Sequence, residues 1–145
     1  MDAAGAELLQ NGGMEAGDDI PDGWRATEGV QVVRDTRVAH EGTASARLDA
    51  REKSGNVNQM LTGIGGKAVA ISGWVKAQPG TGAVQLFVLN FDTRDQNDWK
   101  SLGWQTLVRF KEAPADWTRF EGTYEFPPEA GTAIFGLLIE GKGVA

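Results

Sequence analysis

The chain has 145 residues, of which 41% are apolar and 23% are charged. This composition fits one globular domain over 1–145 and excludes a wholly disordered chain. Twenty acidic residues against 14 basic ones give a net charge of −6. Such a chain repels phosphate backbones and anionic lipid, so we expect neither nucleic acid nor membrane as a partner. Cysteine is absent, which excludes a disulfide framework and thiolate chemistry.

Short segments of alternating apolar and polar residues predict strands along the whole sequence. In chain order, the candidates are 8–10, 30–35, 44–49, 56–61, 68–77, 83–91, 104–110, 117–126 and 132–140. Helical periodicity is not sustained anywhere. About nine strands in one domain favour an all-β fold of two packed antiparallel sheets, a β-sandwich, because each sheet must cover the apolar face of the other.

The alternation also separates core positions from surface positions. In 68–77, Val69, Ile71, Gly73 and Val75 share one face, which we expect to be core, while Ser72, Trp74 and Lys76 share the other. In 117–126, the expected core face runs from Thr118 through Phe120 and Tyr124 to Phe126. The proline and glycine turn at 78–82 predicts a hairpin between the strands on either side of it.

The longest irregular stretch is predicted at 92–103, with the sequence DTRDQNDWKSLG. Loops of this length in compact domains are usually functional or disordered. An indole in a mobile, fully wet loop would be costly, so Trp99 favours a functional loop.

Several motifs together resemble the β-sandwich carbohydrate-binding modules of families four, nine and twenty-two, which have a galactose-binding-like jelly-roll fold. The motifs are NGGME at 11–15, AHEGTASARLDAR at 39–51, NVNQML at 56–61, AISGWVKA at 70–77 and DWTRFEGTYEFP at 116–127. Their order matches the family from near residue 8 to the end. The resemblance implies a noncatalytic module that binds a polysaccharide or oligosaccharide, as part of a larger glycan-active enzyme, secreted or at the cell surface.

The resemblance also implies a structural calcium ion. Glu15 stands at the family's carboxylate position in the glycine turn around Gly13, and the HEG turn would add carbonyl oxygens near Glu41 and Thr43. Calcium takes six to eight oxygen ligands, which such a turn could supply. The alternative is that Glu15 merely ends a strand and that Asp18 and Asp19 lie in a solvated turn.

Members of the family close with a further strand that carries a calcium-ligating aspartate, and this strand is missing here. The resemblance therefore implies one unfilled strand position, beside an edge that invites pairing. Three explanations stay open: truncation, a strand donated by another chain in a homodimer or strand exchange, or an amino-terminal segment in that position.

Sugars bind to flat aromatic rings and to planar polar groups that replace the hydrogen bonds lost from water. Trp24 and Trp117 match core positions of the family, whereas Trp74 could line a groove or lie between sheets. The loop and its neighbouring strands offer the other candidates for ligand contact, although Trp104 also fits a core position and the strand polar residues also fit a solvated face. These candidates are Trp99, Trp104, Asp92, Arg94, Asp95, Asn97, Gln85, Asn90, Gln105 and Arg109. Arg51 is a further candidate because it matches a basic position of the family, although the aromatic residue that follows this position in some members is absent here.

The sequence offers little for catalysis. His40 is the single histidine, which excludes a histidine triad and a polyhistidine metal site. A carboxylate pair among Asp92, Asp95, Asp98 and Glu125 stays open as a glycosidase pair. The competing function is a structural or protein-interaction sandwich that dimerises through its exposed edge.

Overall fold

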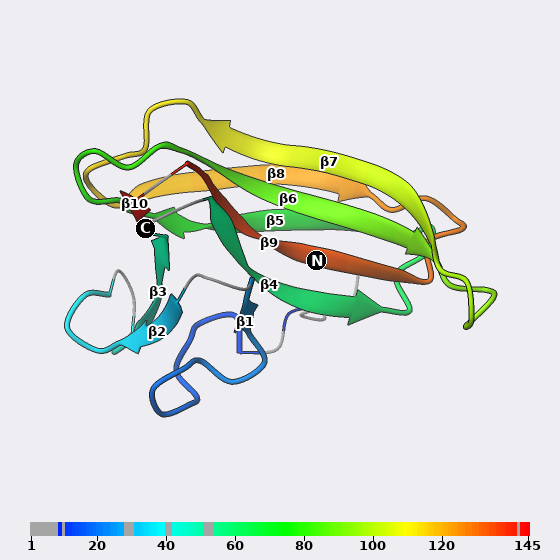
Figure 1. The fold of residues 1–145 in the computed structure, drawn as a ribbon, viewed down its shortest axis with the longest axis horizontal. Helices are drawn as coiled ribbons and strands as arrows, with labels where there is room; N and C mark the ends of the chain where they lie inside the picture. Colours follow the sequence, from blue (N-terminus) through cyan, green and yellow to red (C-terminus); the bar gives the residue numbers. More distant parts are fainter. Residues whose placement is uncertain (1–8, 10, 28–30, 40–41, 51–53, 142) are drawn as a thin grey trace.

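The computed structural model describes residues 9, 11–27, 31–39, 42–50, 54–141 and 143–145. Among these residues there is no helix, and therefore none that could span a membrane. Ten strands make up the regular structure of this described part of the chain (Figure 1). They are β1 (Arg25–Ala26), β2 (Gln31–Asp35), β3 (Ser45–Ala50), β4 (Gly55–Thr62), β5 (Ala68–Val75), β6 (Ala83–Asp92), β7 (Lys100–Phe110), β8 (Thr118–Glu125), β9 (Thr132–Glu140) and β10 (Gly143–Val144).

The strands form two antiparallel layers, as the alternating sequence pattern predicts. One layer is a five-stranded sheet in the order β1-β4-β9-β6-β7. The other layer consists of a three-stranded sheet, β10-β3-β2, and a two-stranded sheet, β5-β8. The prediction of an all-β sandwich is confirmed.

The core lies between the layers and is made by the inward side chains of both. Leu48 and Val75 come from the second layer, and Val84 and Ile139 come from the five-stranded sheet, and all four are buried in one cluster. A second cluster surrounds Val88 and Phe126. Burial alternates along β8, where Phe120 and Tyr124 face inward as expected.

The predicted hairpin across 78–82 is wrong. β5 pairs with β8 along its whole length, whereas β6 pairs with β7 and β9, so the turn crosses from one layer to the other. A proline and glycine turn reverses the chain direction but does not decide which strands pair. Here the turn is tied to β10, because Thr81 Oγ1 accepts a hydrogen bond of 3.1 Å from Val144 N.

Two other boundaries differ from the sequence prediction. β7 begins at Lys100 instead of residue 104, so the irregular segment between β6 and β7 shortens to 93–99. Leu9 belongs to no strand, and residues 8 and 10 of the first expected strand lie outside the described residues.

The turn after Leu9 fixes the indole of Trp24 in the core. The side-chain amide of Asn11 donates to the carbonyl oxygens of Ala16 (2.7 Å) and Asp22 (3.1 Å), and the backbone carbonyl of Asn11 accepts from Trp24 Nε1 at 3.1 Å. Trp24 is 9% exposed, which confirms its predicted core position.

Candidate functional site

Aromatic and polar side chains gather on the outer face of the five-stranded sheet. Residues paired across an antiparallel sheet point to the same side of it, so the strand register places them together. We call this surface the aromatic face. Its members are Asn56, Asn58 and Met60 on β4, Gly136 and Glu140 on β9, Gln85, Phe87 and Phe91 on β6, and Trp104, Thr106 and Arg109 on β7.

Trp104 forms a flat platform on the aromatic face. Its ring stacks on Phe87 with a centroid separation of 4.2 Å and an interplanar angle of 10°. Phe87 is only 1% exposed, while Trp104 is 44% exposed. One face of the indole therefore rests on a buried ring, and the other is open to solvent. The alternative that Trp104 is a core residue is wrong, and its candidacy for ligand contact stays a prediction.

Gln85 holds the Trp104 indole in one orientation. Its side-chain oxygen accepts hydrogen bonds from Trp104 Nε1 at 3.2 Å and from Thr106 Oγ1 at 2.7 Å. Its amide nitrogen donates to Glu140 Oε2 at 3.2 Å. Buried amides with all these partners cannot turn freely, so the platform is preorganised.

Glu140 and Arg109 form a two-bond ion pair at the edge of the platform. Arg109 Nε lies 2.7 Å from Glu140 Oε2, and Arg109 Nη2 lies 2.9 Å from Oε1. The hydrogen bond from Arg109 lowers the pKa of the Glu140 carboxyl, which therefore stays ionised near neutral pH. Fixed planar groups of this kind suit hydroxyl recognition.

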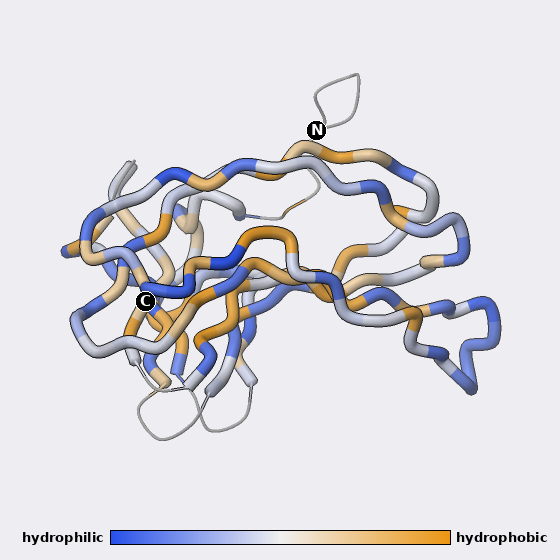
Figure 2. Tube along the Cα trace, turned by 90° about the horizontal axis from the view of Figure 1, so that it is seen from above, coloured by the Kyte–Doolittle hydropathy of each residue, from blue (hydrophilic) through white to orange (hydrophobic). Residues whose placement is uncertain are grey.

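The charged segment between β6 and β7 projects from one end of the sandwich (Figure 2). Trp99 is 45% exposed, and its ring lies 6.0 Å from that of Phe91, which belongs to the aromatic face. The guanidinium of Arg94 donates to both oxygens of Asp92, at 2.6 to 3.1 Å, and this contact lowers the pKa of the Asp92 carboxyl.

Asp95 and Asn97 shape the turn of the same segment. Asp95 Oδ1 accepts from the backbone nitrogen of Asn97 at 3.0 Å, and the Asp95 carbonyl accepts from Asp98 N at 3.1 Å. The segment is thus an ordered turn stabilised by its own carboxylates. Trp99 is the member of this segment that reaches the aromatic face.

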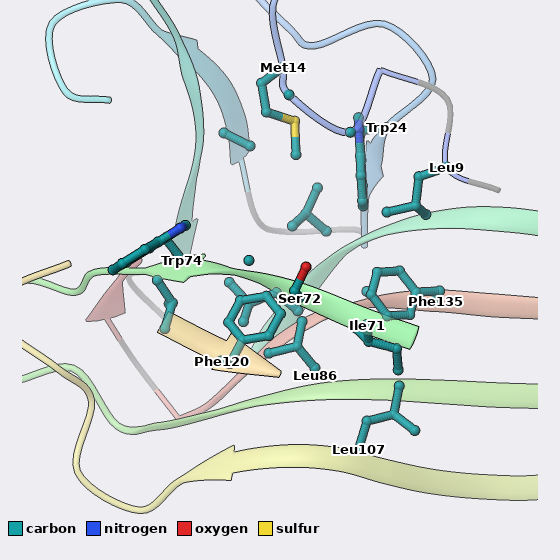
Figure 3. A pocket seen from close by; sticks show the side chains of 18 of the residues that line it. Leu9, Met14, Trp24, Ile71, Ser72, Trp74, Leu86, Leu107, Phe120 and Phe135 are labelled. Atoms are coloured by element: carbon teal, nitrogen blue, oxygen red, sulfur yellow. The ribbon is translucent and has the colours of Figure 1, made fainter. Parts of the chain in front are cut away.

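Three of the other sequence candidates lie elsewhere. Asn90 is 3% exposed and donates to Tyr124 Oη at 2.8 Å, so it faces the core. Gln105 pairs with the buried Val88 and points away from Trp104. Trp74 lies on β5 in the second layer, paired with Arg119, and both residues line a cavity away from the aromatic face (Figure 3). The predicted contact at Arg51 falls outside the described residues.

Glu15 ties the amino-terminal turn to the segment before β3. Its Oε1 accepts from Thr43 N (2.9 Å) and Ala44 N (3.3 Å), and its Oε2 accepts from Thr43 Oγ1 at 2.6 Å. The hydrogen bond from the Thr43 hydroxyl is the main cause that lowers the pKa of the Glu15 carboxyl. Arg34 donates to the carbonyls of Met14 and Glu15, at 2.8 and 2.5 Å.

The sequence profile of one protein family, described as a carbohydrate binding domain, matches residues 6–139. The chain belongs to this family of carbohydrate-binding domains. No curated protein matches the chain.

Solved structures of carbohydrate-binding modules share the fold of this carbohydrate-binding domain. A "Family 16 Carbohydrate Binding Module-2" has 20% sequence identity and a TM-score of 0.70, over 95% of this chain and 93% of that one. The CBM22-1 xylan-binding domain from Paenibacillus barcinonensis Xyn10C has 20% identity and a TM-score of 0.60, over 88% and 87% of the two chains. A second xylan-binding domain from CBM 22 has 14% identity and a TM-score of 0.62, over 86% of each chain.

The described residues of the carbohydrate-binding domain do not fit a calcium ion at Glu15. The Glu15 carboxylate accepts hydrogen bonds from N–H and O–H donors, and the backbone carbonyls of Met14 and Glu15 already accept hydrogen bonds from Arg34. Gly13 is an exposed turn residue, and no cluster of three or more acidic, histidine or cysteine side chains occurs in the described part of the chain. Glu41 lies outside that part, so its role as a calcium ligand stays a prediction.

We expect the melting temperature of the domain to be the same in millimolar calcium as in excess chelator. The reason is that hydrogen bonds from Thr43 and Ala44 already occupy both oxygens of the Glu15 carboxylate. Glu15→Gln should lower the melting temperature in both buffers, because one acceptor oxygen becomes an amide donor. A higher melting temperature in calcium, lost in Glu15→Gln, would contradict this result.

The sequence missed three kinds of residue on the face. The sequence pattern does not single out Phe87, Thr106 and Glu140, which lie within predicted strands, or Asn56 and Asn58, which lie within a family motif. Asn58 Nδ2 donates to Asn56 Oδ1 at 2.7 Å, on the far side of Gly136 from Phe87. Positions 56 and 58 are both asparagine and share one face of the predicted strand, which is a sign of a polar surface. Only the strand order shows that β4 and β6 lie on either side of β9.

Proposed function

We propose that the aromatic face binds a polysaccharide or oligosaccharide chain without chemical change to it. The observation that carries the proposal is the exposed, preorganised Trp104 ring, stacked on Phe87 and hydrogen-bonded to Gln85. A pyranose ring has apolar faces that pack on a flat indole, and hydroxyl groups at its rim that require hydrogen-bond partners.

Polar groups on both sides of Gly136 supply hydrogen-bond partners for the sugar hydroxyls. Arg109, Glu140 and Thr106 lie on the near strands, and Asn56 and Asn58 lie across Gly136 on β4. Gly136 lies between Phe87 and Asn58 in the sheet, and because it has no side chain, none projects from this position of the aromatic face. We infer that a sugar chain lies across the strands, with Trp104 and Asn58 under different units of the chain.

Carboxylates near the face are suited to binding and not to hydrolysis. Glycoside hydrolysis needs one carboxyl group that is protonated near neutral pH. The pKa values of Asp92 and Glu140 are both lowered by arginine partners, so these groups stay ionised. The carboxylates therefore serve as hydrogen-bond acceptors and as supports for Arg94 and Arg109.

Xylan is the first polysaccharide to test, because two of the structural relatives are xylan-binding domains. We further propose that the domain acts as a targeting module of a larger secreted or surface glycan-active enzyme. This placement rests on the resemblance of the sequence motifs to modules found beside xylanases and cellulases.

The proposal is tested by affinity electrophoresis in gels that contain xylan, soluble cellulose derivatives, mannan or no polysaccharide. We expect retarded migration in at least one polysaccharide gel, with a dissociation constant in the range of about micromolar to millimolar, because an open face encloses little of its ligand. Unretarded migration in every gel, by protein that is folded by circular dichroism, would contradict the proposal.

A further inference from the structure

Glu140, Gln85 and Trp104 lie on three neighbouring strands of the aromatic face, and Gln85 is on the middle one. The Gln85 side chain, in a residue that is 8% exposed, bonds to both neighbours. Its amide nitrogen donates to Glu140 Oε2 at 3.2 Å, and its oxygen accepts from Trp104 Nε1 at 3.2 Å. The strand order β9-β6-β7 therefore joins three side chains, far apart in the sequence, into one hydrogen-bonded row.

The two ends of this row decide how the Gln85 amide is turned. An indole N–H can only donate, and an ionised carboxylate can only accept. One orientation of Gln85 satisfies both ends, with its oxygen toward Trp104 and its nitrogen toward Glu140. The Thr106 hydroxyl donates to the same Gln85 oxygen at 2.7 Å, so it offers a ligand only its lone pairs.

The Glu140 carboxylate is held at its end of the row by Arg109. Arg109 Nε and Gln85 Nε2 both donate to Oε2, whereas Arg109 Nη2 donates to Oε1. A carboxylate oxygen accepts about two hydrogen bonds, so Oε2 is fully used within the protein and Oε1 keeps one lone pair for a ligand. Half of this carboxylate therefore acts on the protein itself.

A bulge in β7 brings Arg109 to this position. The ladder between β6 and β7 skips Leu107. Arg109 and Thr106 are three positions apart, so in a regular strand they would face opposite sides of the sheet. With the extra residue between them, both side chains reach the same face, one beside Glu140 and the other beside Gln85.

We propose that Glu140 is a positioning residue for glycan binding, which acts through the Gln85 amide to hold the Trp104 indole. This inference rests on the proposed function of the aromatic face, but the order of the indole is a property of the free protein. Without an acceptor at position 140, the Gln85 nitrogen can turn to Thr106 Oγ1, which already lies within hydrogen-bonding distance of this amide. Gln85 then no longer accepts from Trp104 Nε1, and the indole N–H loses its partner.

The test follows the Trp104 indole proton of the free protein by nuclear magnetic resonance, with Trp104→Phe to assign the signal. We expect Gln85→Met to speed exchange of this proton with solvent by about fivefold, because the acceptor is removed. Glu140→Met keeps the length of the side chain without its oxygens and should speed exchange by about threefold or more. The double variant should exchange no faster than Gln85→Met alone, since Glu140 acts through Gln85.

Glu140→Gln is the conservative variant that should restore slow exchange. Two donors face the Oε2 position and one faces Oε1, so the new amide places its oxygen at Oε2 and still accepts from Gln85. We expect exchange of the Trp104 proton within about twofold of the unchanged chain. Exchange as fast as in Glu140→Met would contradict the role of this acceptor oxygen.

Two further signals separate positioning from a general loss of structure. Glu121→Met removes the ion pair with Arg119 on β8, in the other layer, and should leave the Trp104 proton unchanged. The Trp24 indole donates to the backbone carbonyl of Asn11, so its proton reports on the fold in the same spectrum. It should exchange equally slowly in every variant.

Two results would overturn the proposal. Unchanged exchange of the Trp104 proton in Glu140→Met would show that Gln85 keeps its orientation without this carboxylate. Faster exchange in the double variant than in Gln85→Met would show that Glu140 acts on the indole by another route.

Glycan retention of the same variants separates this proposal from the proposed function. If Glu140→Met weakens retention but leaves the Trp104 proton unchanged, Glu140 contacts the sugar directly, so the positioning role fails and the proposed function stands. If even the unchanged chain is not retarded by any polysaccharide, the proposed function fails, and proton exchange still decides whether Glu140 orders the indole.

Discussion

Trp104→Ala is expected to weaken polysaccharide binding by at least about tenfold, with the fold unchanged. Loss of a well-supported aromatic contact at the centre of a binding surface commonly costs more than about 1.4 kcal/mol, which corresponds to tenfold in affinity. Trp104 is the aromatic ring that combines a buried support, a fixed indole N–H and an open face. Isothermal titration with the polysaccharide that retards the domain in gels measures the effect.

Trp74→Ala is the matched control, because Trp74 is similarly exposed, at 38%, but lies in the second layer, away from the aromatic face. We expect its affinity to stay within about twofold of the unchanged chain. Full loss of binding in Trp74→Ala, with binding kept in Trp104→Ala, would move the ligand site to the β5-β8 sheet.

Phe87→Ala is expected to lower the free energy of unfolding by about 3 kcal/mol and also to weaken glycan binding. Phe87 is 1% exposed and supports the Trp104 ring, so its removal leaves a cavity and frees the indole. Urea unfolding followed by circular dichroism measures the first effect, and titration of the folded fraction measures the second.

Phe87→Leu separates these two effects. Leucine fills most of the volume, so stability should fall by less than about 1.5 kcal/mol, whereas the stacked support of Trp104 is lost. We expect weaker binding in a domain of nearly normal stability. Unchanged affinity in both Phe87 variants would show that Trp104 does not need the ring beneath it.

The alternating pattern predicted the strands well but not their neighbours. Segments 68–77 and 83–91 are strands as expected, yet they lie in different layers, because pairing is decided by contacts far apart in the sequence. The same limit applied to the site. The pattern could place Gln85 and Arg109 on strand faces, but not next to Glu140.

Two predicted site residues point to the other side of their strands, because neighbouring residues of a strand face opposite sides. Asn90 was grouped with Gln85 although the two differ by an odd number of positions on β6, and they face opposite sides. Gln105 and Trp104 are adjacent on β7 and diverge in the same way. Trp24 could be predicted correctly because its position in the family motif pattern indicated the core.

The most direct test of the aromatic face is a nuclear magnetic resonance titration with an oligosaccharide of the polysaccharide that the domain binds. The five tryptophans give five indole N–H signals. The account predicts that the signals of Trp104 and Trp99 shift during the titration, while those of Trp24, Trp74 and Trp117 stay in place. Shifts confined to Trp74 and Trp117, with the Trp104 signal unmoved at saturation, would contradict it.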